Sequence, residues 1–244
     1  MKSILFVSII SLAAAACVDQ LDGEQDETTE VPRLAANGMT PNQIQVTSLD
    51  AAALTGTSIG SIASTADGRS FLSYLVGCAL TSSQTLTTGS YSFTGSLGLA
   101  PEWTTGALSL SDRRWVSACV LARSNSAGSS VSLSMRGTNA QLFLSGEGGY
   151  GVEEGAFYGD IFVGGAGRHV CADVDVRERP MYGTLKTRMC AHGDEGVGQP
   201  TVCGFTFAGN CESTCSFTSP SYTSCTDASG GTWSEVIKVN LGGT

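Results

Sequence analysis

The cysteines of this chain constrain its fold more than any other feature. Nine occur in 244 residues, and Cys203, Cys211 and Cys215 fall within thirteen residues of one another. Clusters this dense hold either a metal ion or a set of disulfides. Cys211 and Cys215 have the spacing of a zinc-ligand pair, but no second pair matches it. We therefore expect disulfides here and no metal site.

The first residues of the chain account for the odd number of cysteines. Lys2 precedes an apolar run from Ile4 to Ala16, which has the layout of a secretory signal peptide and is too short to span a bilayer. The ending Ala-Ala-Ala-Cys at residues 14–17 resembles the lipobox of bacterial lipoproteins. This resemblance implies cleavage after Ala16 and lipidation of Cys17. Cleavage without lipidation, which would release a secreted protein, is the alternative.

Lipidation of Cys17 would leave eight cysteines for pairing. Export places them in an oxidising compartment, where disulfides form and persist, so we expect four bridges. The sequence alone does not choose among the possible connectivities. The candidates are Cys78, Cys119, Cys171, Cys190, Cys203, Cys211, Cys215 and Cys225.

An acidic segment follows the lipidated cysteine. Residues 18–33 contain six acidic side chains against one arginine, and no apolar period runs through them. Such a segment buries too little surface to offset the entropy of ordering, so we interpret residues 17–43 as a lipidated cysteine followed by a disordered tether. The chain as a whole carries a net charge of −9, which argues against a nucleic-acid partner. In lipoproteins of this kind, aspartate after the cysteine favours inner-membrane retention; here Val18 occupies that position, which favours the outer membrane.

The remaining residues, 44–244, are enough for a single domain with its own core. Two stretches in its first half repeat apolar residues at helical spacing, and we expect helices near residues 67–80 and 111–123, capped by Asp67 and Ser111. Each places one cysteine on its apolar face. A buried disulfide between Cys78 and Cys119 is therefore the pairing that we favour.

Short alternating segments surround these helices. Residues 91–99, 131–137, 141–146, 170–176 and 236–241 alternate apolar and polar side chains, as half-buried strands do. We expect 131–137 and 141–146 to form a hairpin, and 203–210 to form a cross-linked hairpin in the cysteine-rich part, 170–244. The fold class that this pattern predicts is α+β, mostly antiparallel sheet and sandwich-like, with two amphipathic helices and disulfide staples.

The sequence offers little for catalysis. Gly56-Thr57-Ser58-Ile59-Gly60 matches the serine motif of α/β-hydrolases, but it lacks the strand and the βαβ scaffold that give the motif its geometry. His169 and His192 are the only histidines. Either can serve as a general base if a serine and a carboxylate lie near it, although a solvated loop position is the commoner role. We expect no catalytic residue and no cofactor.

Two tryptophans are candidates for ligand binding. Trp103 and Trp233 lie in turn-like segments, where an exposed indole can stack on a ligand such as a sugar, or can close the edge of a core. The segments SYLVGCAL, GSLGLAPEW and RRWVSACVLAR, with the closing run of cysteines, resemble those of uncharacterised myxobacterial-type cell-surface lipoproteins. That resemblance implies a place at the cell envelope and no particular activity.

The sequence thus predicts a lipid-anchored protein of the cell envelope, at the outer membrane and facing either the periplasm or the outside. Its expected role is binding, adhesion or structural contact, with the membrane as one partner through the N-terminal lipid and an envelope glycan or protein as another. A hydrolase that uses His192 or His169 as its general base is the alternative. Membrane release of a Cys17→Ala variant would test the anchor.

Overall fold

The structure, a computed structural model, describes residues 38–44, 51–142, 148–163, 167–179, 182–194 and 196–242. These residues belong to one compact unit, Val31–Thr244. Cys17 and the expected tether up to residue 37 lie outside the described residues. No helix in the described ranges has both the length and the apolar character that crossing a bilayer requires.

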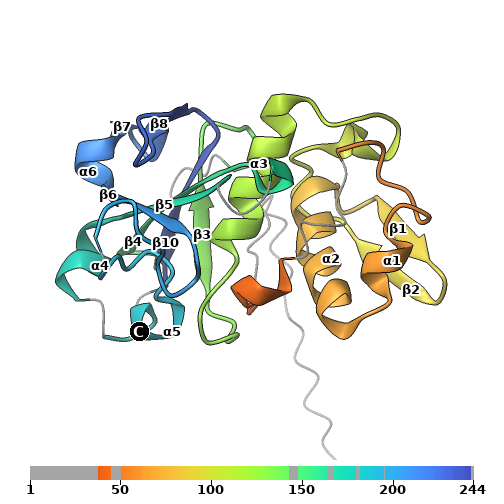
Figure 1. Cartoon of the computed structure of the whole chain (residues 1–244), viewed down its shortest axis with the longest axis horizontal. Coiled ribbons are helices and arrows are strands. Elements are labelled where there is room, and N and C mark those ends of the chain that lie inside the picture. Colours follow the sequence, from red (N-terminus) through yellow and green to blue (C-terminus); the bar gives the residue numbers. More distant parts are fainter. Residues whose placement is uncertain are drawn as a thin grey trace, which may run out of the picture. The chain divides into compact units, whose positions relative to one another are not determined.

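A five-stranded sheet forms the centre of the fold (Figure 1). Its strands, in spatial order, are β3 (Leu133–Arg136), β10 (Val236–Leu241), β4 (Val152–Gly159), β5 (Arg168–Ala172) and β6 (Thr206–Asn210). The first three neighbouring pairs are antiparallel and the last, β5 with β6, is parallel. All six residues of β10 are buried, because the strand is flanked on both edges and covered on both faces.

One helix covers a face of this sheet, and a second helix packs on the first. α3 (Leu110–Ala122) packs on β4 and β10, and α2 (Ala66–Ala79) packs against α3. Both helices start with a side-chain cap, because Thr65 accepts a hydrogen bond from the Gly68 amide and Ser109 accepts one from the Asp112 amide. The two predicted helices are confirmed, but their caps lie two residues before the expected Asp67 and Ser111.

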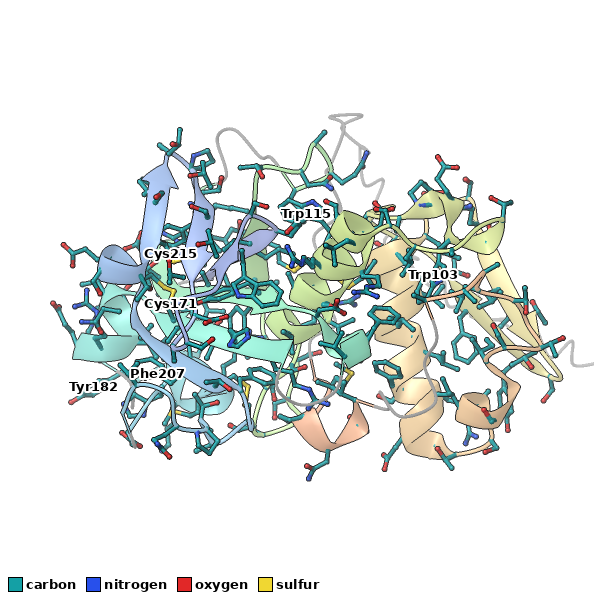
Figure 2. The ribbon with its side chains drawn as sticks, turned by 45° about the horizontal axis from the view of Figure 1, so that its top comes forward. Trp103, Trp115, Cys171, Tyr182, Phe207 and Cys215 are labelled. Carbon is teal, nitrogen blue, oxygen red and sulfur yellow. A yellow bond between two sulfur atoms is a disulfide. The ribbon has the colours of Figure 1, made fainter. Side chains whose placement is uncertain are left out.

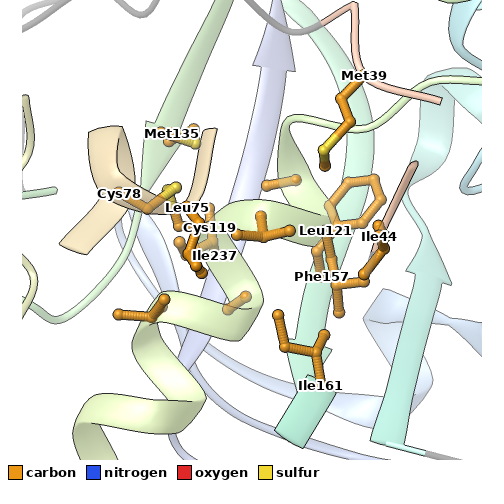
Figure 3. Packing of buried hydrophobic residues seen from close by; sticks show 14 of the residues in the cluster. Met39, Ile44, Leu75, Cys78, Cys119, Leu121, Met135, Phe157, Ile161 and Ile237 are labelled. Atoms are coloured by element: carbon orange, nitrogen blue, oxygen red, sulfur yellow. A yellow bond between two sulfur atoms is a disulfide. The ribbon is translucent and has the colours of Figure 1, made fainter. Parts of the chain in front are cut away.

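The main core lies between these helices and the sheet. Leu75 of α2, Ile237 of β10 and Phe157 of β4 are fully buried in it. Figure 3 shows the cysteines of α2 and α3 meeting within this packing, and their sulfurs form the disulfide Cys78–Cys119. The pairing inferred from the two apolar helix faces is therefore confirmed.

A small three-stranded sheet covers the opposite face. It consists of β7 (Cys215–Thr218), β8 (Ser221–Thr226) and β9 (Thr232–Trp233), and β8 contacts β10. The two-residue period of a strand divides the side chains of β4 between the two faces. Phe157 joins the helical core, whereas Ala156 and Tyr158 join a second apolar cluster beneath the small sheet.

The other elements are short. A hairpin, β1 (Thr85–Thr88) with β2 (Tyr91–Thr94), packs against α2. The remaining helices are η1 (Pro41–Gln43), α1 (Gly60–Ala63), η3 (Pro101–Thr104), η4 (Ile161–Val163), α4 (Val174–Glu178), α5 (Leu185–Arg188) and α6 (Cys211–Thr214). The predicted class, α+β with mostly antiparallel sheet and disulfide staples, is confirmed.

Two local expectations differ from the structure, and a third falls mostly outside the described residues. The alternating run 170–176 is a strand only as far as Ala172, because Asp173 accepts a hydrogen bond from the Val174 amide and starts α4. The segment 203–210 does not turn back on itself at Gly209; β6 pairs in parallel with β5, and its first residues pair antiparallel with the preceding segment through the bridge between Pro200 and Thr206. β3 pairs with β10, and the segment 141–146, which we expected to pair with it, lies outside the described residues from residue 143 on.

Candidate functional site

Every cysteine of the dense cluster at residues 203–215 takes part in a disulfide. Besides Cys78–Cys119, the bridges are Cys171–Cys211, Cys190–Cys203 and Cys215–Cys225. Three sulfur atoms, those of Cys171, Cys211 and Cys215, lie within 4.8 Å of one another, which is a spacing that metal ligands also have. All three are oxidised here, and a metal needs thiolates, so the cluster is a pair of adjacent disulfides (Figure 2).

A buried lysine lies between these disulfides and the central sheet. Lys238 belongs to β10, where alternation turns it away from the helical core that takes Ile237 and Val239. Its side chain is only 5% exposed, and its Nζ lies 2.8 Å from Glu153 Oε1 and 3.2 Å from Asp173 Oδ2. Two carboxylates thus compensate one ammonium at the boundary between the two sheets.

Two aromatic rings of the small sheet flank the same ammonium. The Lys238 Nζ lies 5.1 Å from the ring centroid of Phe217 and 5.2 Å from that of Tyr222, within the range of cation–π attraction. The Tyr222 hydroxyl donates to Asp173 Oδ2 at 3.0 Å. Burial, together with the neighbouring Asp173 charge, raises the pKa of Tyr222, so this hydroxyl stays protonated and keeps donating.

These groups line a cavity of about 390 Å³, which we call the Lys238 site. Phe217 is 55% exposed at its mouth, so a large apolar surface faces solvent beside charged groups. Arg177 and Glu212, whose side chains approach to 3.5 Å, form another part of the wall. The lining residues are Glu153, Asp173, Val174, Arg177, Glu212, Cys215, Phe217, Tyr222 and Lys238.

The Lys238 site offers hydrogen bonding and stacking. Its ammonium is held by two carboxylates and so is a poor nucleophile or base. Its carboxylates accept hydrogen bonds, and its exposed ring offers a flat apolar face. Sequence reasoning missed this site, although one signal was present: Lys238 is the single charged residue inside the apolar strand 236–241.

His169 lies on the same face of the sheet but in a closed environment. It is 7% exposed, it stacks on Tyr158 at 5.7 Å between ring centroids, and Trp233 covers it at 5.2 Å. Its Nε2 is 3.7 Å from Asp227 Oδ2, and its Nδ1 has no hydrogen-bond partner among the residues that the structure describes. Burial lowers the pKa of His169, with the Asp227 charge opposing this, so the imidazole is neutral at pH 7.

Asp227, the carboxylate beside that imidazole, organises a turn. Burial disfavours its charge, but hydrogen bonds from the Ser229 hydroxyl, the Trp233 indole and the Gly231 and Ser229 amides outweigh this and lower its pKa to about 2. The Trp233 indole N–H is therefore occupied, at 2.7 Å. The Arg114 guanidinium lies 4.6 Å from the ring of Trp233 and occupies one of its faces. Trp233 thus helps to close the turn.

Trp103 is a core residue. It lies in η3, is 1% exposed, donates from its indole to the Ala52 carbonyl at 2.7 Å and packs edge-on against Phe162 (Figure 2). A ligand cannot stack on a buried indole, so the ligand role considered for Trp103 gives way to the alternative of a core plug. Trp103 and Trp233 occur in different parts of the fold and do not form a common surface.

The other catalytic candidates are also separate. His192 Nδ1 lies 3.2 Å from Asp194 Oδ1 beyond α5, without the geometry of a hydrogen bond. The Ser58 hydroxyl donates to the Thr55 carbonyl and accepts from the Thr55 amide, which makes it part of an exposed turn. Within the described ranges, no contact joins Ser58 to either histidine. The nucleophile, base and carboxylate of a serine hydrolase are therefore not assembled from these residues.

No protein-family model matches this chain, and no match was found among curated proteins or among solved structures.

Proposed function

We propose that this protein is a non-enzymatic binding protein of the cell envelope, and that it recognises an envelope glycan through the Lys238 site. The observation that carries this proposal is the exposed Phe217 ring at the mouth of a cavity lined by hydrogen-bonding carboxylates. A sugar ring has an apolar face edged by hydroxyl groups. An aromatic ring beside acceptors is complementary to that pattern.

The electrostatics of the site favour a neutral or weakly cationic ligand. Three carboxylates and two cations line the cavity, and Lys238, the most buried of the five, is already compensated. Of these groups, Glu212 and Glu153 retain the most exposure and are the ones available to accept hydrogen bonds from hydroxyl or amide groups. An anionic ligand would meet this acidic rim and be repelled.

Four disulfides fit an oxidising, extracytoplasmic compartment. We further propose that lipid on Cys17 attaches the protein to the outer membrane. It predicts that a Cys17→Ala variant leaves the membrane fraction while its folded part is unchanged. Persistence of that variant in the membrane fraction would contradict the anchor and leave the binding proposal intact.

Binding can be tested with neutral N-acetylglucosamine oligomers, titrated into the full chain by calorimetry. Removing the stacking ring in Phe217→Ala should weaken binding by about tenfold, since aromatic contacts of this kind contribute about 1 kcal/mol or more. Tyr182→Ala is the matched control, because Tyr182 is 73% exposed and does not line the cavity.

Two outcomes would overturn this proposal. If Phe217→Ala and Tyr182→Ala weaken glycan binding equally, any exposed aromatic ring contributes to that binding, and the cavity is not the binding site. Covalent labelling of the protein by a serine-hydrolase probe, lost in His169→Ala or His192→Ala, would establish the hydrolase alternative instead.

A further inference from the structure

A second cavity, of about 480 Å³, opens where η1, the start of β5 and the turn after residue 200 meet. It shares no lining residue with the Lys238 site. Its walls are formed by Thr40, Pro41, Asn42, Ser126, Arg168, Thr201, Val202, Cys203 and Gly204. We call this cavity the Arg168 site.

Arg168 is an unusual arginine in this fold. Its side chain is half-buried, its Nε is fully buried without a hydrogen-bond acceptor, and it has no ion pair within the part of the chain that the structure describes. By contrast, Arg113 and Arg188 reach carboxylates at 2.5 and 2.8 Å. Burial lowers the pKa of Arg168, and no carboxylate counteracts it. A cation held in this way is stabilised by any anion that reaches it.

The other walls can donate hydrogen bonds to the same anion. Thr40, Asn42, Ser126 and Thr201 bring three hydroxyl groups and one amide to the cavity. The Thr201 hydroxyl accepts a hydrogen bond from the Cys203 amide at 3.3 Å, so its own proton is free to be donated. None of the lining residues is acidic, although the chain carries a net charge of −9. The cavity thus has one positive charge and several donors, without a competing carboxylate.

One wall of the cavity is held in place covalently. Cys203 is bonded to Cys190, which fixes the turn that carries Thr201 and Val202. Arg168 itself is anchored by the pairing of β5 with β4, where it lies opposite Gly159. Binding an anion between two fixed walls costs little ordering of the protein.

We propose that the Arg168 site binds an oxyanion, a phosphate or a carboxylate, carried on a small polyol such as a sugar. The guanidinium offers a fork of parallel N–H groups that matches the two oxygens of such a group. The hydroxyl-rich walls are complementary to the hydroxyl groups of a polyol. This inference is independent of the proposed function, because the two cavities have different residues and opposite preferences for charge.

The test uses the full chain and four probes in calorimetric titrations: inorganic phosphate, glucose 6-phosphate, glucuronate and neutral glucose. We expect at least one anionic sugar to bind about tenfold more tightly than glucose, and more tightly than inorganic phosphate. The tighter of glucose 6-phosphate and glucuronate identifies the oxyanion. Absence of saturable binding for all three anions would overturn the proposal.

Variants of Val202 give the sharpest control, because this residue lines the cavity and is 64% exposed, so its replacement leaves the core intact. Val202→Asp places a carboxylate beside the guanidinium and should weaken anion binding about tenfold or more. Val202→Asn introduces a side chain of the same shape as aspartate but without the charge, and should not weaken anion binding. Added salt should reduce the difference. Equal affinities of the two variants would contradict an anion site here.

Arg168→Gln should abolish measurable anion binding, and Arg168→Lys should retain part of it, because the charge remains and the fork is lost. Arg69→Gln is the matched control, since Arg69 does not line the cavity. Circular dichroism establishes that each variant is folded. Undiminished binding by folded Arg168→Gln would overturn the proposal, and Phe217→Ala, which belongs to the other site, should leave anion binding unchanged.

Discussion

The sulfur atoms of Cys171 and Cys215 lie 3.4 Å apart, although each is bonded to a different partner. β5 and β7 bring them together, and their partners, Cys211 and Cys225, lie at the start of α6 and in β8. Thiol–disulfide exchange needs a thiolate next to a disulfide sulfur. If one bridge is lost, the thiolate that it leaves behind therefore lies in position to attack the other bridge.

This contact predicts the outcome of a Cys225→Ser substitution. The freed Cys215 thiolate can attack the Cys171 sulfur, which forms a Cys171–Cys215 bond and releases Cys211 as a thiolate. Peptide mapping after alkylation should find this new bridge and an alkylated Cys211. In a Cys119→Ser control the free thiol should remain on Cys78. Alkylation confined to Cys215 in Cys225→Ser would contradict the prediction.

A second prediction concerns the buried pair Arg188–Glu154. The Arg188 Nε lies 2.8 and 2.9 Å from the two carboxylate oxygens, and both side chains are at most 1% exposed. Glu154→Gln would leave the guanidinium charge uncompensated, so the free energy of unfolding in urea should fall by about 3–5 kcal/mol. The control, Glu212→Gln, removes an exposed pairing and should cost less than about 1 kcal/mol.

Asp227 predicts a pH dependence of stability. Its pKa of about 2 in the folded state lies below the ordinary 3.8, so its charged form stabilises the fold above that ordinary value. This contribution, roughly 1–2 kcal/mol, is lost as the pH falls from about 4 to about 2. Urea unfolding at a series of pH values should show a loss in this window that Asp227→Asn lacks. Asp194→Asn, an exposed carboxylate, should retain it.

A substitution of Trp103 distinguishes a role of this residue in the core from a role at a binding surface. Trp103→Phe removes the hydrogen bond to Ala52 and leaves unfilled volume, so the free energy of unfolding should fall by about 2–3 kcal/mol. Binding to the N-acetylglucosamine oligomers should not change, because Trp103 does not line the Lys238 site. A loss of affinity in the folded variant, without a loss of stability, would restore the surface role.

The features predicted correctly from the sequence depend on local signals. Helices α2 and α3 have an apolar stripe of their own, and that stripe also located Cys78 and Cys119 on facing surfaces. The helix α4 was missed because the valines of residues 170–176 alternate as in a strand. There the hydrogen bond between Asp173 and the Val174 amide decided the backbone conformation, and alternation did not.

The two proposed sites could not be located from sequence because their residues meet only through long-range pairing. Lys238 reaches Glu153 across 85 positions, and only the order of strands β10 and β4 brings them together. Arg168 meets Thr40 and Thr201 in the same way. Composition indicates that such charged residues exist, but the register of the sheet determines their neighbours.

The position of β10 also imposes an order of events on folding. This strand fills the gap between β3 and β4, yet it follows both of them in the chain, and it follows all eight paired cysteines as well. Disulfides that form before β10 joins the sheet therefore form while the central sheet still lacks its middle strand. Native pairing is therefore favoured when oxidation is slow enough for β10 to join the sheet first, or when bonds made too early can still exchange.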